Sequence, residues 1–269
     1  MINNTELVTA NPWHELKRFT PARIALGRAG MSQTTEVNLN FQLAHALARD
    51  AVNLPLDFNT LTNDLSALNV SSRMLSSQAS QHAQYLQRPD LGRKLSQTSQ
   101  DELAKQLHTN YDAVIVIADG LSSTAIQAHA APFVTLLLPA LTAKGYQCPE
   151  LCLVKQGRVA IGDAIAAHYS ARFCIVLIGE RPGLSSPDSM GIYFTYQAKP
   201  GITTDAERNC ISNIHSNGLS YNQALVKLLY LLEHADLLGL SGVGLKDETS
   251  EVDTPSLAAT DSVAISLFD

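Results

Sequence analysis

The chain has 269 residues, of which 45% are hydrophobic and 16% are charged; this composition excludes a disordered chain and is enough for a sizeable core. The segment 247–269 holds six acids and no Lys or Arg, which accounts for the net charge of −6 and leaves a neutral body without a nucleic-acid footprint. With four cysteines but no CxxC spacing, no secretory leader and no apolar run of about 20 residues, we expect a cytoplasmic protein with reduced thiols and no membrane segment.

The N-terminal part of the chain, residues 1–110, predicts an irregular arm followed by a mainly helical portion. In the arm, 1–22, we expect Trp13, the only tryptophan, to hold the arm in place by packing against something. Leucines then recur with the spacing of helices: Leu39, Leu43, Leu47, Leu61, Leu65 and Leu68. Ser99 and Glu102 predict a capping box at the start of a further helix.

The pattern changes at 111, where short apolar runs begin to alternate with helical stretches. The runs typical of strands are 113–118, 151–154, 173–178 and 191–196. Helices are predicted from Ser122 or Ser123 with an interruption at Pro132, then over 159–169 and 220–238. This alternation predicts an α/β domain over 111–246, with a Rossmann-like, mostly parallel sheet covered by helices. We expect the acidic segment 247–269 to be a disordered tail.

The turn after the first predicted strand lacks the glycines of a nucleotide-binding loop. It reads Asp119-Gly120-Leu121-Ser122-Ser123-Thr124, which is neither GxGxxG nor GxxxxGK[ST]. A free-standing nucleotide-dependent enzyme therefore remains only an alternative interpretation of the fold.

Three polar positions qualify as candidates for chemistry. Asp119 follows a strand and could bind a ligand, but the sequence favours the simpler role of ordering its turn and capping the next helix. Glu180 ends a fully apolar strand, where it either accepts hydrogen bonds from a neutral ligand or pairs with Arg181 or Arg208. A nucleophile pair of Cys210 with His215 is conceivable, although no orienting acid is fixed and a cysteine is more often a small buried hydrophobe. No acid–base–nucleophile set converges, which favours a binding surface over a complete active site.

Six segments, in this order, together carry a family resemblance: LGRAG (26–30), YLQRPDLGRKL (85–95), VIADGLSSTAI (116–126), KQGRVAIGDAI (155–165), LIGERPGL (177–184) and ERNCISNIHSNG (207–218). Over residues 12–246 the chain resembles the small subunit of ethanolamine ammonia-lyase, an adenosylcobalamin-dependent enzyme.

The resemblance implies a function shared with a second chain. The family converts ethanolamine to acetaldehyde and ammonia by a radical mechanism. A large subunit, a TIM barrel, supplies most catalytic groups, and the small subunit covers the cobalamin, which is bound base-on. Several large–small pairs form the complex. The motifs carry three cobalamin contacts onto Val159, Glu180 and Cys210, and they assign no catalytic residue and no metal ligand to this chain.

Two departures from the family pattern affect what the resemblance implies. The N-terminal arm is shorter than in better-known members, where the extra segment serves targeting to a bacterial microcompartment, so encapsulation of this cytoplasmic protein is in doubt. The acidic tail has no counterpart in the family. A purely structural subunit without cofactor contacts is the other alternative.

Overall fold

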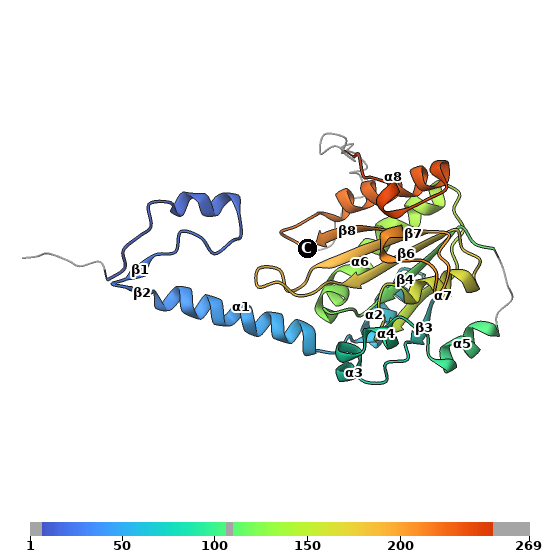
Figure 1. Ribbon diagram of the computed structural model, residues 1–269, viewed down its shortest axis with the longest axis horizontal. Coiled ribbons are helices and arrows are strands. Elements are labelled where there is room, and N and C mark those ends of the chain that lie inside the picture. The colour runs from blue at the N-terminus through green and yellow to red at the C-terminus, as the bar shows by residue number, and fades with distance from the viewer. Residues whose placement is uncertain (1–6, 106–109, 250–269) are drawn as a thin grey trace, which may run out of the picture.

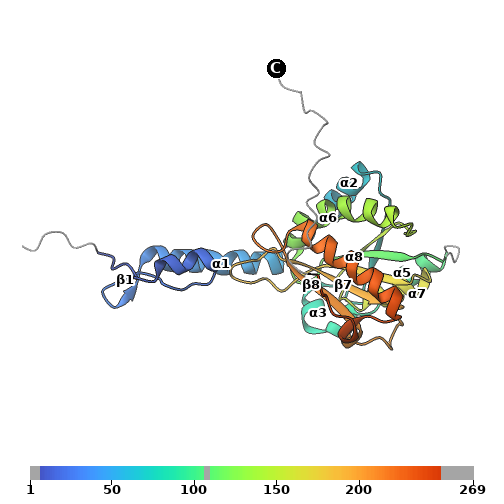
Figure 2. The same cartoon turned by 90° about the horizontal axis from the view of Figure 1, so that it is seen from above.

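A projecting arm forms the N-terminal end of the described chain. The computed structural model describes residues 7–105 and 110–249. The arm contains the short 3-10 helix η1 (His14–Phe19), the two-stranded hairpin β1 (Arg28–Ala29) and β2 (Ser32–Gln33), and the long helix α1 (Thr35–Asn53). Thr34 caps α1 by accepting a hydrogen bond from the Val37 amide. Figures 1 and 2 show this arm extending away from the rest of the protein.

The chain then enters the body through a run of short elements. These are α2 (Phe58–Ala67), β3 (Ser72–Ser76), α3 (His82–Gln87), α4 (Pro89–Gly92) and α5 (Gln97–Ala104). The strand β3 was not expected from the sequence. The predicted capping box at Ser99 is wrong, because Ser96 caps α5. The Ser99 hydroxyl is inside the helix and accepts a hydrogen bond from the Ser76 amide at 2.8 Å, which ties α5 to β3.

A six-stranded mixed sheet forms the centre of the body, with the strand order β3-β5-β4-β6-β7-β8. Its other members are β4 (Ala113–Ala118), β5 (Leu151–Lys155), β6 (Phe173–Gly179), β7 (Met190–Tyr196) and β8 (Arg208–Ile214). The strands β3, β5, β4 and β6 pair in parallel, whereas β6–β7 and β7–β8 pair antiparallel. The prediction of an α/β fold with a helix-covered sheet is thus confirmed, and the antiparallel pairs make the sheet mixed.

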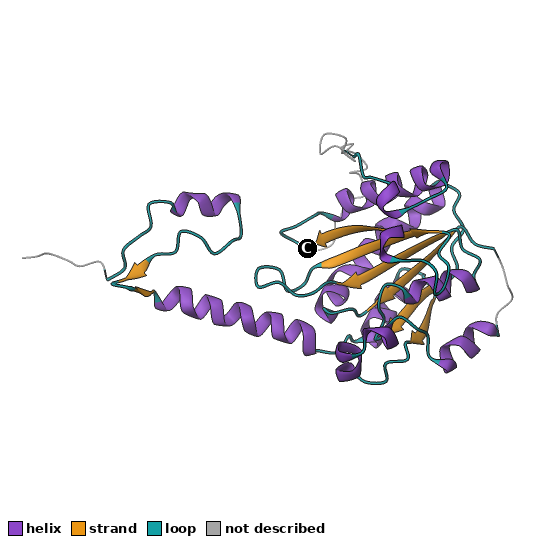
Figure 3. Ribbon diagram, in the orientation of Figure 1, coloured by secondary structure: helices purple, strands orange, loops and turns teal. Residues whose placement is uncertain are grey.

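Helices cover both faces of this sheet, as Figure 3 shows. Alternate residues of the central strands point to opposite faces: Ile115 and Ile117 pack with α2, α6 (Ser123–Ala143) and α8 (Tyr221–Leu238). Val114 and Val116 pack instead with α5 and α7 (Ile161–His168), on what we call the α7 face. Because both faces of the central strands are buried, every position along these strands must be apolar.

Helix α6 is continuous, so the predicted interruption at Pro132 is wrong. Both Pro132 and Pro139 lie inside the helix. A proline within a helix removes one hydrogen bond and costs about 3 kcal/mol. Ten buried α6 residues, among them Phe133 and Leu137, offset this cost through their packing. By length and apolar composition α6 could cross a membrane, but half of the stretch is buried within the protein, as in a core helix.

Two short 3-10 helices flank the last strand and the last helix of the described chain. The 3-10 helix η2 (Asp205–Glu207) leads into β8, and η3 (Gly242–Gly244) follows α8. Ser220 and Gln223 form a capping box at the start of α8, and Gly239 ends this helix with φ of +69°. The predicted disordered tail lies almost wholly outside the described residues.

Candidate functional site

Glu180 lies directly after β6, and the neighbouring strands hold its carboxylate in place. Oε1 accepts a hydrogen bond from the Ser212 hydroxyl at 2.5 Å. Oε2 accepts hydrogen bonds from the Ser189 hydroxyl at 2.6 Å and the Asn213 amide at 3.1 Å. A carboxylate has about four acceptor positions, and these contacts occupy three of them. Glu180 can therefore accept one further hydrogen bond, on Oε1.

A glycine in the adjacent strand makes room for the Glu180 side chain. A Cβ atom built on Gly191, the second residue of β7, would lie 2.8 Å from Glu180 Oε1 and 3.1 Å from its Cγ. Any larger residue at position 191 would push the carboxylate out of this position. The predicted alternative, an ion pair with Arg181 or Arg208, is wrong: among the described residues neither arginine forms a salt bridge with Glu180, and Arg208 binds Asp163 instead.

Cys210 is the third residue of β8, so the predicted polar segment around it is in fact a strand. It pairs with Tyr193 of β7, which packs partly against the core of the α7 face, and Cys210 is exposed beside it. Desolvation raises the pKa of the Cys210 thiol; the hydrogen bond with Tyr193 opposes this shift, and the Glu180 carboxylate adds to it. A thiol with a raised pKa is a poor nucleophile, and His215 contacts Asn213 and the Asn217 amide. The hypothesis of a Cys210–His215 nucleophile pair thus gains no support from the geometry.

Val159 occupies the turn between β5 and α7, where it is half-buried and packs against the core of the α7 face. The turn is fastened to the N-terminal part of the body through Arg158. The Arg158 amide donates to the Gly92 carbonyl at 2.8 Å, and its guanidinium lies 4.2 Å from the centre of the Tyr85 ring. These contacts fix the position at which Val159 is presented.

Asp119 joins the turns that follow β4 and β5. Its carboxylate accepts hydrogen bonds from the amides of Gln156 at 2.8 Å, Gly157 at 3.1 Å and Gly120 at 3.0 Å. Burial raises the pKa of Asp119 to about 6, although these hydrogen bonds oppose the shift. The prediction that Asp119 orders its turn is confirmed, but the helix that follows is capped by Ser122, whose side chain accepts from the Ala125 amide.

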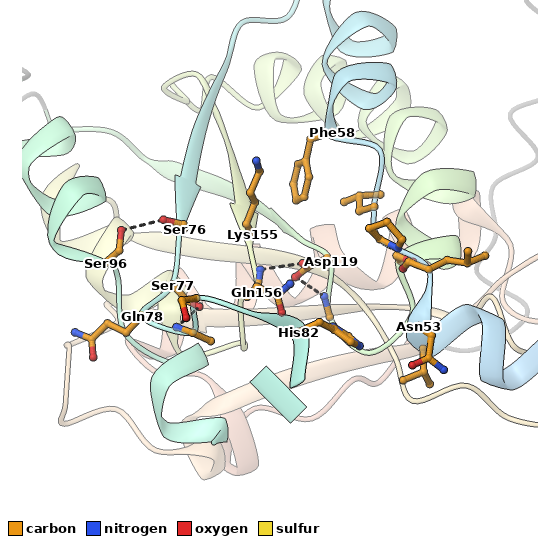
Figure 4. Close-up of a pocket in the computed structure, with 18 of the residues that line it drawn as sticks. Asn53, Phe58, Ser76, Ser77, Gln78, His82, Ser96, Asp119, Lys155 and Gln156 are labelled. Carbon is orange, nitrogen blue, oxygen red and sulfur yellow. Dashed lines mark hydrogen bonds between the residues drawn. The ribbon is translucent and has the colours of Figure 1, made fainter. Parts of the chain in front are cut away.

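A cleft of about 680 Å³ opens at the carboxyl ends of β3, β4 and β5, with Asp119 and Gln156 in its lining (Figure 4). Lys155 and Phe58 lie together on one side of it, with the ammonium 5.5 Å from the ring centre. None of Val159, Glu180 and Cys210 lines this cleft. A shallower recess of about 490 Å³ includes Cys210 and Ser212.

The structure brings two of the three candidate residues together. Ser212, which donates to Glu180, lies two residues after Cys210 in β8, so Glu180 and Cys210 lie on the same part of the surface. The Tyr193 side chain forms a hydrogen bond with the Cys210 thiol. Val159 lies on the same α7 face at the start of α7, with no direct contact to the other two. Tyr193 and Ser212 were not among the predicted site residues. Ser212 could have been found from the alternation along β8, because every second side chain of a strand points to the same face and Ser212 follows Cys210 by two residues.

Comparison with known proteins identifies the family. The model of the ethanolamine ammonia-lyase light chain (EutC) family matches residues 10–246. An ethanolamine ammonia-lyase small subunit from Pseudomonas fluorescens (strain Pf0-1) is 52% identical over 262 residues, which are 96% of this chain and 95% of the relative. The small subunit from Azotobacter vinelandii is 51% identical over 244 residues, covering 89% of this chain and 90% of the relative. The chain therefore belongs to the family of ethanolamine ammonia-lyase light chains, the small subunits of that lyase.

Proposed function

We propose that this chain forms one wall of an adenosylcobalamin site, and that a large TIM-barrel subunit forms the other wall. Ethanolamine is converted to acetaldehyde and ammonia only by the assembled complex, which contains several large–small pairs. Val159, Glu180 and Cys210 contact the cofactor from this side. The observation that carries the proposal is the cluster of polar side chains around Glu180 and Cys210, which lies at the surface on one face of the protein. The relatives of this chain are named small subunits, so a large subunit is available to cover that face.

The chemistry of this surface fits a corrin ring with its neutral amide arms. The remaining acceptor position on Glu180 Oε1 suits an amide NH2 donor, and a hydrogen bond to a charged group contributes about 1.5–3 kcal/mol. Val159 and the ring of Tyr193 offer apolar contact, and the Cys210 thiol is a weak donor. When bound, adenosylcobalamin supplies the radical that starts the reaction. The residues of this chain bind and orient the cofactor and shield it from water.

The ionisable groups of this surface favour binding over catalysis. The Glu180 carboxylate is engaged by two hydroxyls and one amide. Asp119, which lines the separate cleft, is engaged by three backbone amides. The raised pKa of Cys210 keeps this residue a thiol at neutral pH. We therefore infer that the acid–base groups for ethanolamine belong to the large subunit.

Reconstitution from separate subunits tests this proposal. The chain alone is expected to release no acetaldehyde from ethanolamine, and addition of the large subunit and adenosylcobalamin is expected to start turnover. The pair should also keep cobalamin through gel filtration, as followed by corrin absorbance. Replacing Val159, Glu180 and Cys210 together by alanine should release the cofactor while the pair still forms. Turnover by the chain alone, or full cofactor retention by the triple variant, would refute the assignment.

A further inference from the structure

The N-terminal arm, which we define as residues 7–53, buries little of its apolar surface. Helix α1 has 19 residues, of which only Ala44 and Ala51 are buried. The arm is about a fifth of the described chain, yet it carries more than half of the large apolar side chains that are exposed there. Figures 1 and 2 show that the body does not cover it from either direction.

Exposed leucines form a stripe along α1. Leu39, Leu43 and Leu47 recur every fourth residue along α1 and are 58%, 56% and 48% exposed. Elsewhere in the arm, Trp13 before η1 and Phe19 at its end are 67% and 72% exposed. Trp13, which was predicted to hold the arm against something, is thus not buried among the described residues of this chain. A stripe with this spacing is the form in which a helix docks into the groove of another protein.

Arg23 connects the arm to the surface that carries Glu180. Its guanidinium donates to the Leu184 carbonyl at 3.0 Å and lies 5.5 Å from the centre of the Phe41 ring on α1. Leu184 belongs to the loop between β6 and β7, and the same loop contains Glu180 and Ser189. A protein that covers Glu180 is therefore placed next to the arm.

The charges of the arm disfavour pairing between two copies of it. Over residues 7–53 the arm contains five basic side chains and three acids, a net charge of +2. The positive excess lies in the segment 7–34, which has four basic side chains and one acid: Lys17, Arg18, Arg23, Arg28 and Glu15. Two such segments would repel each other on contact. An apolar groove with an acidic rim complements the arm in both shape and charge.

We propose that the arm docks into such a groove on the large subunit and holds the two chains together beside the cofactor surface. This inference rests on the proposed function, because that function supplies the large subunit as the partner. It assigns to the arm a task separate from cofactor binding: the stripe on α1 provides affinity, and Arg23 fixes the angle at which the arm leaves the body.

The test replaces Leu39, Leu43 and Leu47 together by glutamine in the full-length chain. Glutamine keeps the helix propensity of leucine, so α1 should persist. The dissociation constant for the large subunit is expected to rise about tenfold or more, since three apolar anchors are lost. The control replaces Leu237 and Leu238, two exposed leucines at the end of α8, by glutamine and should change the constant less than about twofold. Thermal unfolding of each variant alone shows that the body remains folded.

The outcomes separate this inference from the proposed function. Unchanged affinity of the triple variant, with the wild-type pair still binding and active, overturns the role of the arm and leaves the function standing. A wild-type chain that neither binds the large subunit nor supports turnover overturns the function itself. If the wild-type chain forms dimers that the triple variant cannot form, and both bind the large subunit equally, the occupant of the stripe is a second copy and the inference is wrong.

Discussion

Arg208 of β8 and Asp163 of α7 form a two-bond ion pair, with both terminal nitrogens of the guanidinium 2.7 Å from a carboxylate oxygen. Each side chain is only 3% exposed. The pair joins the first residue of β8 to the helix that follows Val159, and Thr195 adds a hydrogen bond to Arg208 at 3.1 Å. It therefore couples β8, which carries Cys210, to the helix next to Val159.

Breaking this pair should destabilise the protein strongly. Asp163→Asn leaves the buried guanidinium with only the exposed Asp205, 3.5 Å from its Nε, as counter-ion, and we expect a loss of roughly 3–5 kcal/mol in the free energy of unfolding. Urea denaturation measures the change. The control is Asp90→Asn, which breaks the exposed pair with Arg88 and should change stability by less than about 1 kcal/mol. Equal effects of the two substitutions would contradict the structural role of Asp163.

The position of Glu180 can be disturbed from a neighbouring residue. Gly191→Ala places a Cβ against Glu180 Oε1 and Cγ, so the carboxylate must move. We expect about a tenfold loss of cobalamin affinity in the assembled pair, as for loss of one charged hydrogen bond. Equilibrium binding followed by corrin absorbance measures this loss. Glu180→Gln should give a similar loss, whereas Glu233→Gln, on the exposed side of α8, should give none. A Gly191→Ala pair with wild-type affinity would show that the position of Glu180 is irrelevant.

Asp119 should make stability decrease as the pH rises. Burial raises its pKa from 3.8 to about 6, so the folded protein binds a proton in a pH range where the unfolded chain does not. Its favourable contribution is full below pH 3.8 and is lost as the pH passes 6, by ~3 kcal/mol at 1.36 kcal/mol per pKa unit. The free energy of unfolding should therefore fall by about this amount more in the wild type than in Asp119→Asn between pH 4 and 7. Parallel pH profiles of the two proteins would exclude a raised pKa.

Gly120 is required by both its backbone conformation and its surroundings. It has φ of +66°, and a Cβ there would lie 2.3 Å from the Gly179 carbonyl oxygen. Gly145 has φ of +78° with nothing within 4 Å of such a Cβ. Gly145→Ala should therefore cost only about 1 kcal/mol for the conformation, and Gly120→Ala clearly more because the strand ends must separate. Thermal unfolding compares the two variants. An equal decrease in Tm would mean that the backbone near Gly179 moves away from the new Cβ at no measurable cost in stability.

The predicted strands were those whose sequence is apolar throughout. The runs 113–118 and 173–178 lie in the middle of the sheet, where helices cover both faces, and the structure places β4 and β6 there. The strands β3 and β8 were missed because they are the two edges of the sheet. Their sequences, SRMLS and RNCISNI, keep polar residues where one face is exposed, so they lack the continuous apolar signal.

The candidate site was predictable residue by residue but not as an arrangement. The place of Glu180 at a strand end followed from the apolar run before it. Its contacts with Ser212 and Asn213 could not be predicted, since they depend on the register of β8, which was not recognised as a strand. Likewise, the course of α6 through Pro132 depends on burial against β6, β7 and α8, which the local sequence does not show.

The exposure of Cys210 has a practical consequence. Burial raises the pKa of Cys148 to about 11 and that of Cys152 to about 12, and Cys174 is enclosed in the core. Cys210 is the one exposed thiol of the four. Because the proposal places Cys210 at the cofactor surface, a thiol reagent should modify it more slowly once cobalamin and the large subunit cover that surface, so assembly can be followed by chemical protection without engineering the cysteines.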